Sequence, residues 1–245
     1  MAEVLDTLVV GGGLAGIAAT LELQRAGKRV LLVEQAARLG GKASSVTTKA
    51  GEFPTGPTSF NGRHAAFWRL IDGLGLGDQV VRLHPSASAR FIVRGGKLRS
   101  LRPSPLSLVT TSALTLREKV ALASELMTRG QAPAGDESLR ALLERRFGSS
   151  AVTHFFAAVM TGVFAGDLER LSARACMPAM VAAEQTHGSV LRGLLKGMRA
   201  HEAGARPGLY TFERGFRVIG ERAAERLPCR REARVERLEV SADGV

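Results

Sequence analysis

The sequence predicts an α/β fold with a parallel sheet, which begins with a βαβ unit and is interrupted by a mostly helical region. Residues 7–10 form a short apolar run, typical of a buried parallel strand. From Leu14, apolar residues recur at helical spacing until Gly27, where the helix is expected to end. Residues 30–33 are again apolar. A strand, a helix and a strand of these lengths predict one right-handed βαβ unit.

The rest of the chain repeats no βαβ pattern, and its expected elements follow from hydrophobic periodicity and turn residues. Helices are expected over residues 65–74, 116–129, 138–147, 150–164, 173–186, 190–201 and 216–226. A β-hairpin is expected over 89–101 around Gly95 and Gly96, and strands are expected over 210–212 and 234–240. Residues 43–62 are rich in Gly, Ser, Thr and Pro, which predicts loops with short extended pieces.

Charge and composition limit the partners. The 245 residues carry 34 basic and 23 acidic side chains, a net charge of +11, which favours anionic partners. Aromatic residues make up only 5% of the chain, and no recognition-helix pattern accompanies the charge, so no nucleic-acid partner is expected. The two cysteines form no CxxC pair, and no apolar run reaches the ~18 residues that span a bilayer. We expect a cytoplasmic protein with at most peripheral attachment to the cytoplasmic membrane.

Three glycines after the first strand, Gly11, Gly13 and Gly16, match the pattern G-x-G-x-x-G. The first permits a tight turn, the second lets a pyrophosphate approach the backbone, and the third allows the helix to pack closely on the sheet. The free N–H groups at the helix start would face the phosphates. Glu34, which ends the second strand, can accept hydrogen bonds from ribose hydroxyls. These features predict a dinucleotide site but do not separate NAD from FAD.

The turn after Glu34 distinguishes an FAD site from an NAD site. Arg38-Leu39-Gly40-Gly41-Lys42 resembles the R-x-G-G-[KR] stretch of a large family of FAD oxidoreductases, which includes amine oxidases, phytoene desaturases and protoporphyrinogen oxidases. In that family the two glycines let the backbone pass close to the cofactor, and the arginine lies near its ribose and phosphates. The resemblance therefore implies FAD.

Four later segments resemble the protoporphyrinogen oxidases in particular. Gly56-Pro57-Thr58-Ser59-Phe60 is similar to a G-P-N-S-F segment beside the flavin, with Thr58 in place of the usual Asn. The segment 89–98 resembles the hairpin of that family, and 184–194 resembles its E-x-x-[YH]-x-S-[IV]-x-x-G stretch. Residues 161–167, followed by Leu171-Ser172, are similar to a signature that amine oxidases and phytoene desaturases do not share.

The resemblance implies a substrate and an acceptor. The substrate would be a porphyrinogen, protoporphyrinogen IX or coproporphyrinogen III, oxidised to the porphyrin in haem biosynthesis with oxygen as the acceptor. The flavin supplies this chemistry, so neither a catalytic side chain nor a metal ligand is expected. Arg90 would bind a substrate propionate, and the backbone of Gly162 would line the substrate slot. FAD would be held by Gly11, Gly13, Leu14, Ala15, Gly16, Glu34, Gln35, Arg38, Gly40, Gly41, Lys42, Gly56, Pro57, Thr58 and Val235, the last through its backbone at the adenine.

Residues 90–102 contain five basic side chains and no acid. They are Arg90, Arg94, Lys97, Arg99 and Arg102. Those that do not contact the substrate are expected to face water or an anionic membrane surface.

Three segments are expected along the chain. Residues 1–85 would form the first part of the FAD-binding domain, 86–205 an inserted substrate-binding hairpin and helical domain, and 206–245 a return to the FAD-binding domain. Members of the family are longer, so the flavin-ring side of the site is expected to be incomplete, as in an N-terminal half. A homodimer or a complementing C-terminal chain would complete it. The alternatives are an inactive or partner-dependent subunit, or another FAD amine oxidase or desaturase.

Overall fold

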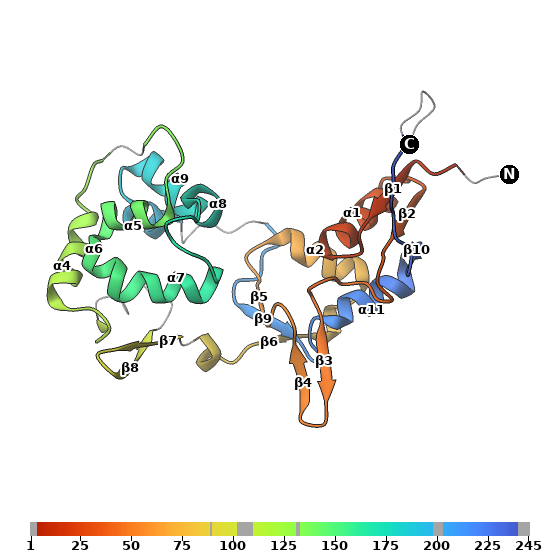
Figure 1. Cartoon of the computed structure of the whole chain (residues 1–245), viewed down its shortest axis with the longest axis horizontal. Coiled ribbons are helices and arrows are strands. Elements are labelled where there is room, and N and C mark those ends of the chain that lie inside the picture. Colours follow the sequence, from red (N-terminus) through yellow and green to blue (C-terminus); the bar gives the residue numbers. More distant parts are fainter. Residues whose placement is uncertain (1–3, 89, 102–109, 131–132, 198–202, 240–245) are drawn as a thin grey trace. The chain divides into compact units, whose positions relative to one another are not determined.

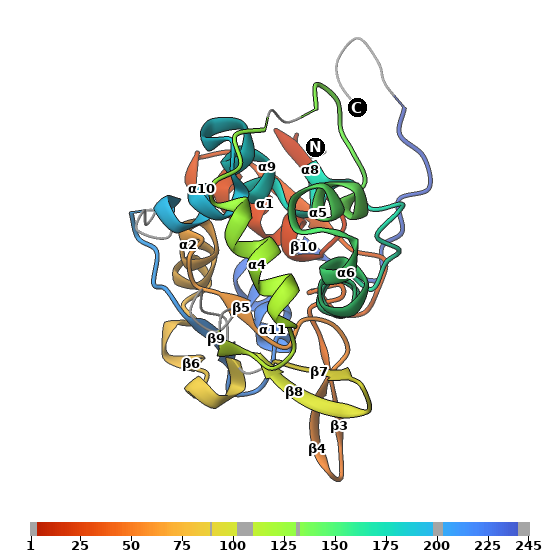
Figure 2. The same cartoon turned by 90° about the vertical axis from the view of Figure 1, so that its left-hand side faces the viewer.

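The computed structural model describes residues 4–88, 90–101, 110–130, 133–197 and 203–239. The chain forms two compact units, residues 1–83 with 202–245 as the first unit and residues 84–201 as the second. The elements of both units can be followed along the chain in Figures 1 and 2. None of the helices in the described ranges is long and apolar enough to cross a lipid bilayer.

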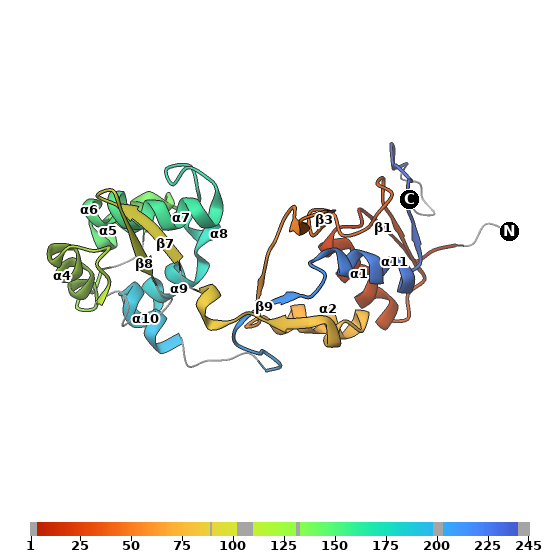
Figure 3. The ribbon, with the colours of Figure 1, turned by 90° about the horizontal axis from the view of Figure 1, so that it is seen from below.

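The first unit is built on the predicted βαβ unit. Its main sheet contains β1 (Thr7–Val10), β2 (Val30–Val33) and β10 (Cys229–Arg230), all parallel, in the order β1-β2-β10. Three helices, α1 (Leu14–Arg25), α2 (Ala65–Leu74) and α11 (Arg217–Arg226), lie on one side of this sheet, as Figures 1 and 3 show. The expected strand, helix and strand are confirmed, as is the expected helix over 65–74.

The remaining strands of the first unit are short and antiparallel. Strands β3 (Ser45–Thr48) and β4 (Gly51–Pro54) form a hairpin. A second sheet contains β5 (Phe60–Asn61), β9 (Leu209–Phe212) and β6 (Val80–Arg82) in that order. A 3₁₀ turn, η1 (Gly77–Gln79), precedes β6. The sequence predicted β9 but not β6. Because β9 pairs with β5 and β6, it joins the segment after the second unit to strands that precede that unit.

An aromatic cluster closes the core beside this second sheet. The ring of Phe60 lies 4.4 Å from that of Phe67, 5.5 Å from Trp68 and 5.6 Å from Tyr210. The indole N–H of Trp68 donates a 2.8 Å hydrogen bond to the Gly62 carbonyl, so the one polar atom of this buried ring is satisfied. Rings from distant segments of the chain therefore pack together on this side of the core.

The second unit contains a hairpin and a group of helices. Its elements are η2 (Pro85–Ser88), β7 (Arg90–Arg94), β8 (Lys97–Leu101), α4 (Leu116–Glu125), α5 (Leu139–Phe147), α6 (Ser149–Ala151), the π-helical segment η3 (Val152–Phe156), α7 (Ala157–Phe164), α8 (Ala173–Cys176), α9 (Pro178–His187) and α10 (Val190–Gly197). The hairpin is confirmed over 90–101, and its turn residues Gly95 and Gly96 both have positive φ. Ala89, Arg102 and residues 198–201, which were expected in the hairpin, the basic run and the last helix, lie outside the described residues.

Two expected helices are divided. Residues 150–164 contain a π-helical stretch between α6 and α7, and the expected helix over 173–186 is broken at Met177. The break has a simple cause, because Pro178 occupies the first turn of α9, where a missing N–H costs nothing.

The strand expected over 234–240 is wrong for residues 234–239, which have no strand structure, and Val240 lies outside the described residues. The chain instead pairs earlier, where Cys229 and Arg230 align with Leu32 and Val33 of β2. Alternation of polar and apolar residues indicated a strand here, but a strand also needs a partner, and no described segment pairs with 234–239.

A buried ionic network joins α4, α5, α9 and α10. Glu184, 1% exposed, accepts hydrogen bonds from Arg145 and from Arg146. Glu125, also 1% exposed, accepts hydrogen bonds from the Ser189 hydroxyl at 2.8 Å and from backbone N–H groups at the start of α10. The 184–194 stretch is therefore occupied by helix packing and capping within the second unit.

Arg94 corrects the expectation that the basic side chains of the hairpin face water or a membrane. Its guanidinium donates to both carboxylate oxygens of Glu118, at 2.7 and 3.0 Å. Glu118 is 2% exposed and also accepts from the Thr115 N–H and the Ser150 hydroxyl. The hydrogen bonds from Arg94 lower the pKa of this carboxyl to about 2, outweighing the desolvation that would raise it.

The sign of this shift predicts acid sensitivity. Because the folded pKa of Glu118 lies below its ordinary value of 4.5, the ion pair stabilises the fold fully above pH 4.5 and is lost as the pH falls towards 2. We expect the free energy of unfolding, measured by urea denaturation between pH 7 and pH 3, to lose about 2 kcal/mol from this group. Glu118→Gln should remove that part of the pH dependence, whereas the exposed control Glu225→Gln should retain it. Identical pH profiles for wild type and Glu118→Gln would contradict the assignment.

Candidate functional site

The turn from β1 into α1 brings its glycines together tightly. Gly11 has a φ of +100° and donates its N–H to the Val33 carbonyl at 2.8 Å. A Cβ on Gly16 would lie 1.9 Å from the Gly11 carbonyl oxygen, so only glycine fits there. A Cβ on Gly13, by contrast, would have no atom within 4 Å. The turn is therefore closed on its inner side and open at Gly13.

Helix α1 begins at this open position without a capping side chain. Gly13 is its N-cap residue, in an extended conformation, and no side chain accepts from its first turn. Leu14 is half-buried and Ala15 is exposed, so the backbone of the first turn is accessible. Uncapped N–H groups and the helix dipole make such an end suitable for phosphate.

Glu34 links the end of β2 to the glycine turn. Its Oε2 accepts the Gly12 N–H at 2.7 Å, and its Oε1 accepts the Ala36 N–H at 2.8 Å. Each carboxylate oxygen keeps a further lone pair for another donor, such as a ribose hydroxyl. Gly12 was not singled out from the sequence, although a Cβ there would lie 2.4 Å from the Leu39 side chain. The run of three glycines at 11–13 was the available signal.

The turn over residues 38–42 is bound directly to the glycine turn. Gly40 donates its N–H to the Gly12 carbonyl at 2.7 Å. A Cβ on Gly41 would lie 3.1 Å from the Gly13 Cα, and Gly41 itself has a φ of +56°. Arg38 is exposed and donates to the Gly41 carbonyl at 3.3 Å. Both predicted glycines are thus required by backbone contact.

A third segment packs on the same turn. A Cβ on Gly56 would lie 2.0 Å from the Lys42 carbonyl oxygen, so residues 56–58 follow the 38–42 turn closely. Pro57 is half-buried, and the Thr58 carbonyl accepts a 3.0 Å hydrogen bond from the Thr211 hydroxyl. The Thr58 side chain has no hydrogen bond among those that the structure records in the described ranges.

Helix α11 also packs against the 38–42 turn. A Cβ on Gly220 would lie 2.2 Å from the Leu39 carbonyl oxygen. Next to this contact, Arg38, Arg217 and Arg231 line a pocket of about 250 Å³ that also includes Glu221. The three arginines outnumber the one acid in this pocket, and such an excess of positive charge suits a site for phosphates. The contact of Gly220 could not be predicted from the sequence, because this glycine lies alone within a helix.

The last predicted cofactor residues lie around the end of β2. Gln35 and Lys42 are exposed, and Val235 is half-buried. The segment that carries Val235 runs along β2 beforehand, since Ala233 donates its N–H to the Glu34 carbonyl at 2.9 Å. The predicted residues of the first unit are therefore gathered at one end of the β1–β2–β10 sheet.

The two predicted substrate residues lie in the second unit. Arg90 opens β7, where it pairs across the hairpin with Leu101, and its guanidinium donates to the Ala87 carbonyl at 3.0 Å. Gly162 lies in α7, is exposed, and a Cβ there would meet nothing within 4 Å. The roles of both residues stay predictions.

The sequence profile of the flavin containing amine oxidoreductase family matches residues 14–245. The chain belongs to this family. Human protoporphyrinogen oxidase is 36% identical over an alignment of 207 residues that covers 78% of this chain and 42% of that protein. Coproporphyrinogen III oxidase of Propionibacterium freudenreichii subsp. freudenreichii is 31% identical over an alignment of 212 residues that covers 81% of this chain and 39% of that protein. The chain thus spans less than half the length of these two curated relatives.

Solved structures give the same assignment. A "putative protoporphyrinogen oxidase" from Exiguobacterium sp. 255-15 matches 92% of this chain and 52% of its own, with 29% identity and a TM-score of 0.68. The resemblance drawn from the sequence motifs is confirmed, and the description of the family names a flavin. The open Gly13 position, the uncapped α1 and Glu34 fit the adenosine diphosphate end of such a cofactor.

The two kinds of glycine in the turn should respond differently to alanine. Gly16→Ala forces a Cβ against the Gly11 carbonyl and should lower the free energy of unfolding by about 1–3 kcal/mol. Gly13→Ala meets open space and should change it by about 0.5 kcal/mol or less, like the control Gly77→Ala, which is also unobstructed. Urea denaturation of the three variants measures this, and equal losses at positions 13 and 16 would refute the geometry.

Proposed function

We propose that this chain binds FAD and takes part in the oxidation of a porphyrinogen, protoporphyrinogen IX or coproporphyrinogen III, to the porphyrin in haem biosynthesis, with oxygen as the acceptor. The observation that carries the proposal is the junction of the glycine turn with residues 38–42. There, Gly40 donates to the Gly12 carbonyl and Gly41 lies against Gly13. This junction leaves the backbone open to a pyrophosphate at Gly13 and at the start of α1.

FAD is favoured over smaller flavins because the residues described at this junction suit its adenosine diphosphate end. The α1 N-terminus faces phosphates, and Glu34 has lone pairs left for ribose hydroxyls. The Val235 backbone follows the segment that is hydrogen bonded to Glu34, which suits the proposed adenine contact. FMN lacks the adenosine part and would lose these interactions.

A porphyrinogen substrate is favoured by the relatives, of which one is named protoporphyrinogen oxidase and another coproporphyrinogen III oxidase. A bound flavin supplies the redox chemistry. The protein then has to hold an apolar macrocycle that carries propionates. The fork of an arginine binds both oxygens of a carboxylate, which suits Arg90 to a propionate. At Gly162 the absence of a side chain leaves room for a flat ligand beside α7.

Binding of the two ligands can be tested separately from turnover. The chain corresponds to 42% of the human relative. The cofactor residues lie in the first unit, and Arg90 and Gly162 lie in the second. A change in one unit is therefore expected to affect one ligand.

The wild-type chain should bind FAD and ADP but not FMN. Flavin absorbance after mild purification and calorimetric titration with the three ligands measure this. Gly13→Ala places a methyl group where the pyrophosphate would approach, so it should weaken FAD binding by about tenfold or more while keeping the fold. Gly77→Ala should bind as the wild type does. A folded wild-type chain that binds neither FAD nor ADP would rule out the proposal.

Arg90→Ala should weaken binding of coproporphyrin III and protoporphyrin IX, stable products that carry the same propionates, by about tenfold or more, because a charge-assisted hydrogen bond is lost. Porphyrin fluorescence titration measures this. Lys97→Ala, a neutralised charge on the same hairpin, should bind as the wild type does. A loss for Lys97→Ala as large as that for Arg90→Ala would indicate general attraction by charge and would argue against a propionate contact at Arg90.

A further inference from the structure

The pocket beside α11 is separate from the open Gly13 position. We call it the α11 pocket, and the residues that line it are Arg38, Leu39, Ser44, Ser45, Arg217, Gly220, Glu221, Ala224 and Arg231. Neither the glycine turn nor Glu34 lines it. Its volume of about 250 Å³ is below the ~300–1,000 Å³ of sites for drug-sized ligands, so a smaller ligand suits it.

Two positive charges in the α11 pocket are not balanced by an acid. Arg38 donates to the Gly41 carbonyl at 3.3 Å, and Arg231 donates to the Ala37 carbonyl at 3.2 Å. Neither guanidinium forms an ion pair within the described ranges. Because a backbone carbonyl carries no net charge, both arginines remain available to an anion.

The third arginine of the pocket and its one acid are already paired. The Arg217 guanidinium lies 2.9 Å from a carboxylate oxygen of Glu52 and 3.6 Å from one of Glu221. Glu221 also lies 3.3 Å from the guanidinium of Arg214. The charge of this acid is therefore shared between two arginines, and the lining as a whole is positive.

The lining also contains an unused hydroxyl group. The Ser45 hydroxyl oxygen is buried and has no hydrogen-bond partner among the described residues. Buried polar groups normally have such a partner. Each guanidinium carries five N–H donors, most of which are free at Arg38 and Arg231. These three side chains can therefore donate to several oxygens of one anion.

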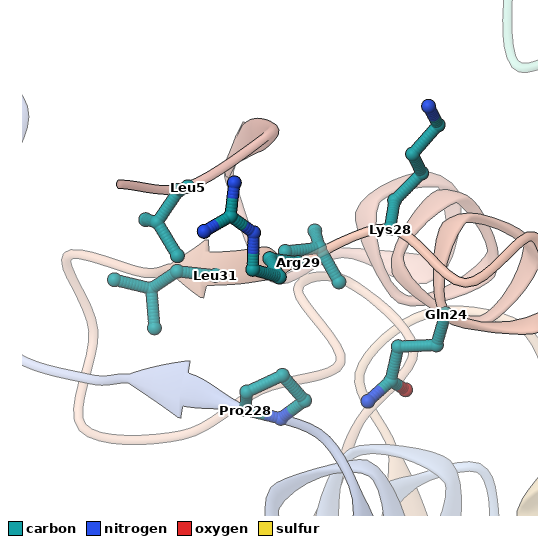
Figure 4. A pocket seen from close by; sticks show the side chains of 7 residues that line it. Leu5, Gln24, Lys28, Arg29, Leu31 and Pro228 are labelled. Carbon is teal, nitrogen blue, oxygen red and sulfur yellow. The ribbon is translucent and has the colours of Figure 1, made fainter. Parts of the chain in front are cut away.

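The hollow of about 440 Å³ in Figure 4 lacks this combination, although it is also lined by basic residues. The Arg29 guanidinium lies 3.1 Å from a carboxylate oxygen of Asp6, so its charge is matched. The Lys28 side chain extends away from Leu31 and Pro228 (Figure 4). Lys28 is therefore a suitable control for the effect of charge alone.

We infer that the α11 pocket binds a phosphate group, either inorganic phosphate or the terminal group of a small phosphomonoester. Arg38 and Arg231 would bind its oxygens through charge-assisted hydrogen bonds, and the Ser45 hydroxyl would donate another. The site goes beyond the proposed function, because the phosphates of FAD are expected at Gly13, which does not line this pocket.

Calorimetric titration of the full chain with inorganic phosphate, in a buffer low in chloride, tests the inference. We expect one phosphate to bind per chain. Arg231→Ala removes a charged donor and should weaken binding by about tenfold or more. Lys28→Ala and Gly13→Ala should bind phosphate as the wild type does. Arg231 carries the test because Arg38 is also a predicted FAD residue.

A second pair of variants predicts a gain of affinity, which misfolding cannot imitate. Glu221→Gln removes the acid from the lining and should tighten phosphate binding by about threefold. Glu225→Gln, a change on the same helix outside the pocket, should leave binding unchanged. Tighter binding by both variants to the same extent would indicate general attraction by charge and would argue against the pocket.

Glycerol 3-phosphate distinguishes the two sources of the phosphate group. An ester that binds more weakly than inorganic phosphate identifies the free anion as the ligand, and an ester that binds at least as tightly identifies a phosphomonoester. Either result supports the α11 pocket if Arg231→Ala weakens it.

Failure of the wild-type chain to saturate below about 10 mM phosphate overturns the inference. So does equal binding by Arg231→Ala and Lys28→Ala. Loss of phosphate binding in Gly13→Ala also overturns it, since the anion would then occupy the proposed cofactor site. Titration of the same samples with ADP separates the two proposals. ADP binding without a phosphate site at Arg231 retains the proposed function alone, and the reverse result retains the α11 pocket alone.

Discussion

The first unit depends on backbone segments that approach too closely for side chains. Gly16 lies on the Gly11 carbonyl, Gly41 on the Gly13 Cα and Gly56 on the Lys42 carbonyl, with no room for a Cβ at positions 16 and 56. These contacts hold the glycine turn, the 38–42 turn and the 56–58 segment together. The strands of the sheet place the start of the glycine turn and of the 38–42 turn, and the missing side chains of the glycines allow the two turns to come into contact. The geometry proposed to bind phosphate is thus a property of the packed backbone, and few side chains contribute to it.

Much of this could be predicted from the sequence because the signals are local. Strand, helix and strand follow from apolar periodicity, and the roles of Gly11, Gly13 and Gly16 follow from their spacing. Residues such as Gly12 and Gly220 escaped notice, because the Leu39 contacts that require them arise only in the folded chain. The pairing of Arg94 with Glu118 was also missed, since the two residues lie 24 positions apart and charge alone does not indicate partners.

The two units solve the problem of burying polar groups differently. In the first unit the core is apolar and aromatic, and its polar contacts are made by the backbone around the site. In the second unit, Glu125, Arg146 and Glu184 are buried together, and the half-buried Arg145 supplies the second positive charge beside Glu184. Removing one member of such a group leaves another buried charge without a partner. A different packing of these helices would do the same, so the ionic group favours a single arrangement of the helices. This fixes the frame on which Arg90 and Gly162 are carried.

The hydrogen bond from the Gly12 N–H to Glu34 has a consequence for how a ligand would be received. The carboxylate already holds the glycine turn in its final shape through a 2.7 Å bond and needs no rearrangement to offer its remaining lone pairs. Ordering a loop at the moment of binding consumes conformational entropy, which lowers affinity. Here that entropy is lost when the chain folds. Association should therefore be a single step limited by encounter, with no slow phase in which the turn closes over its ligand.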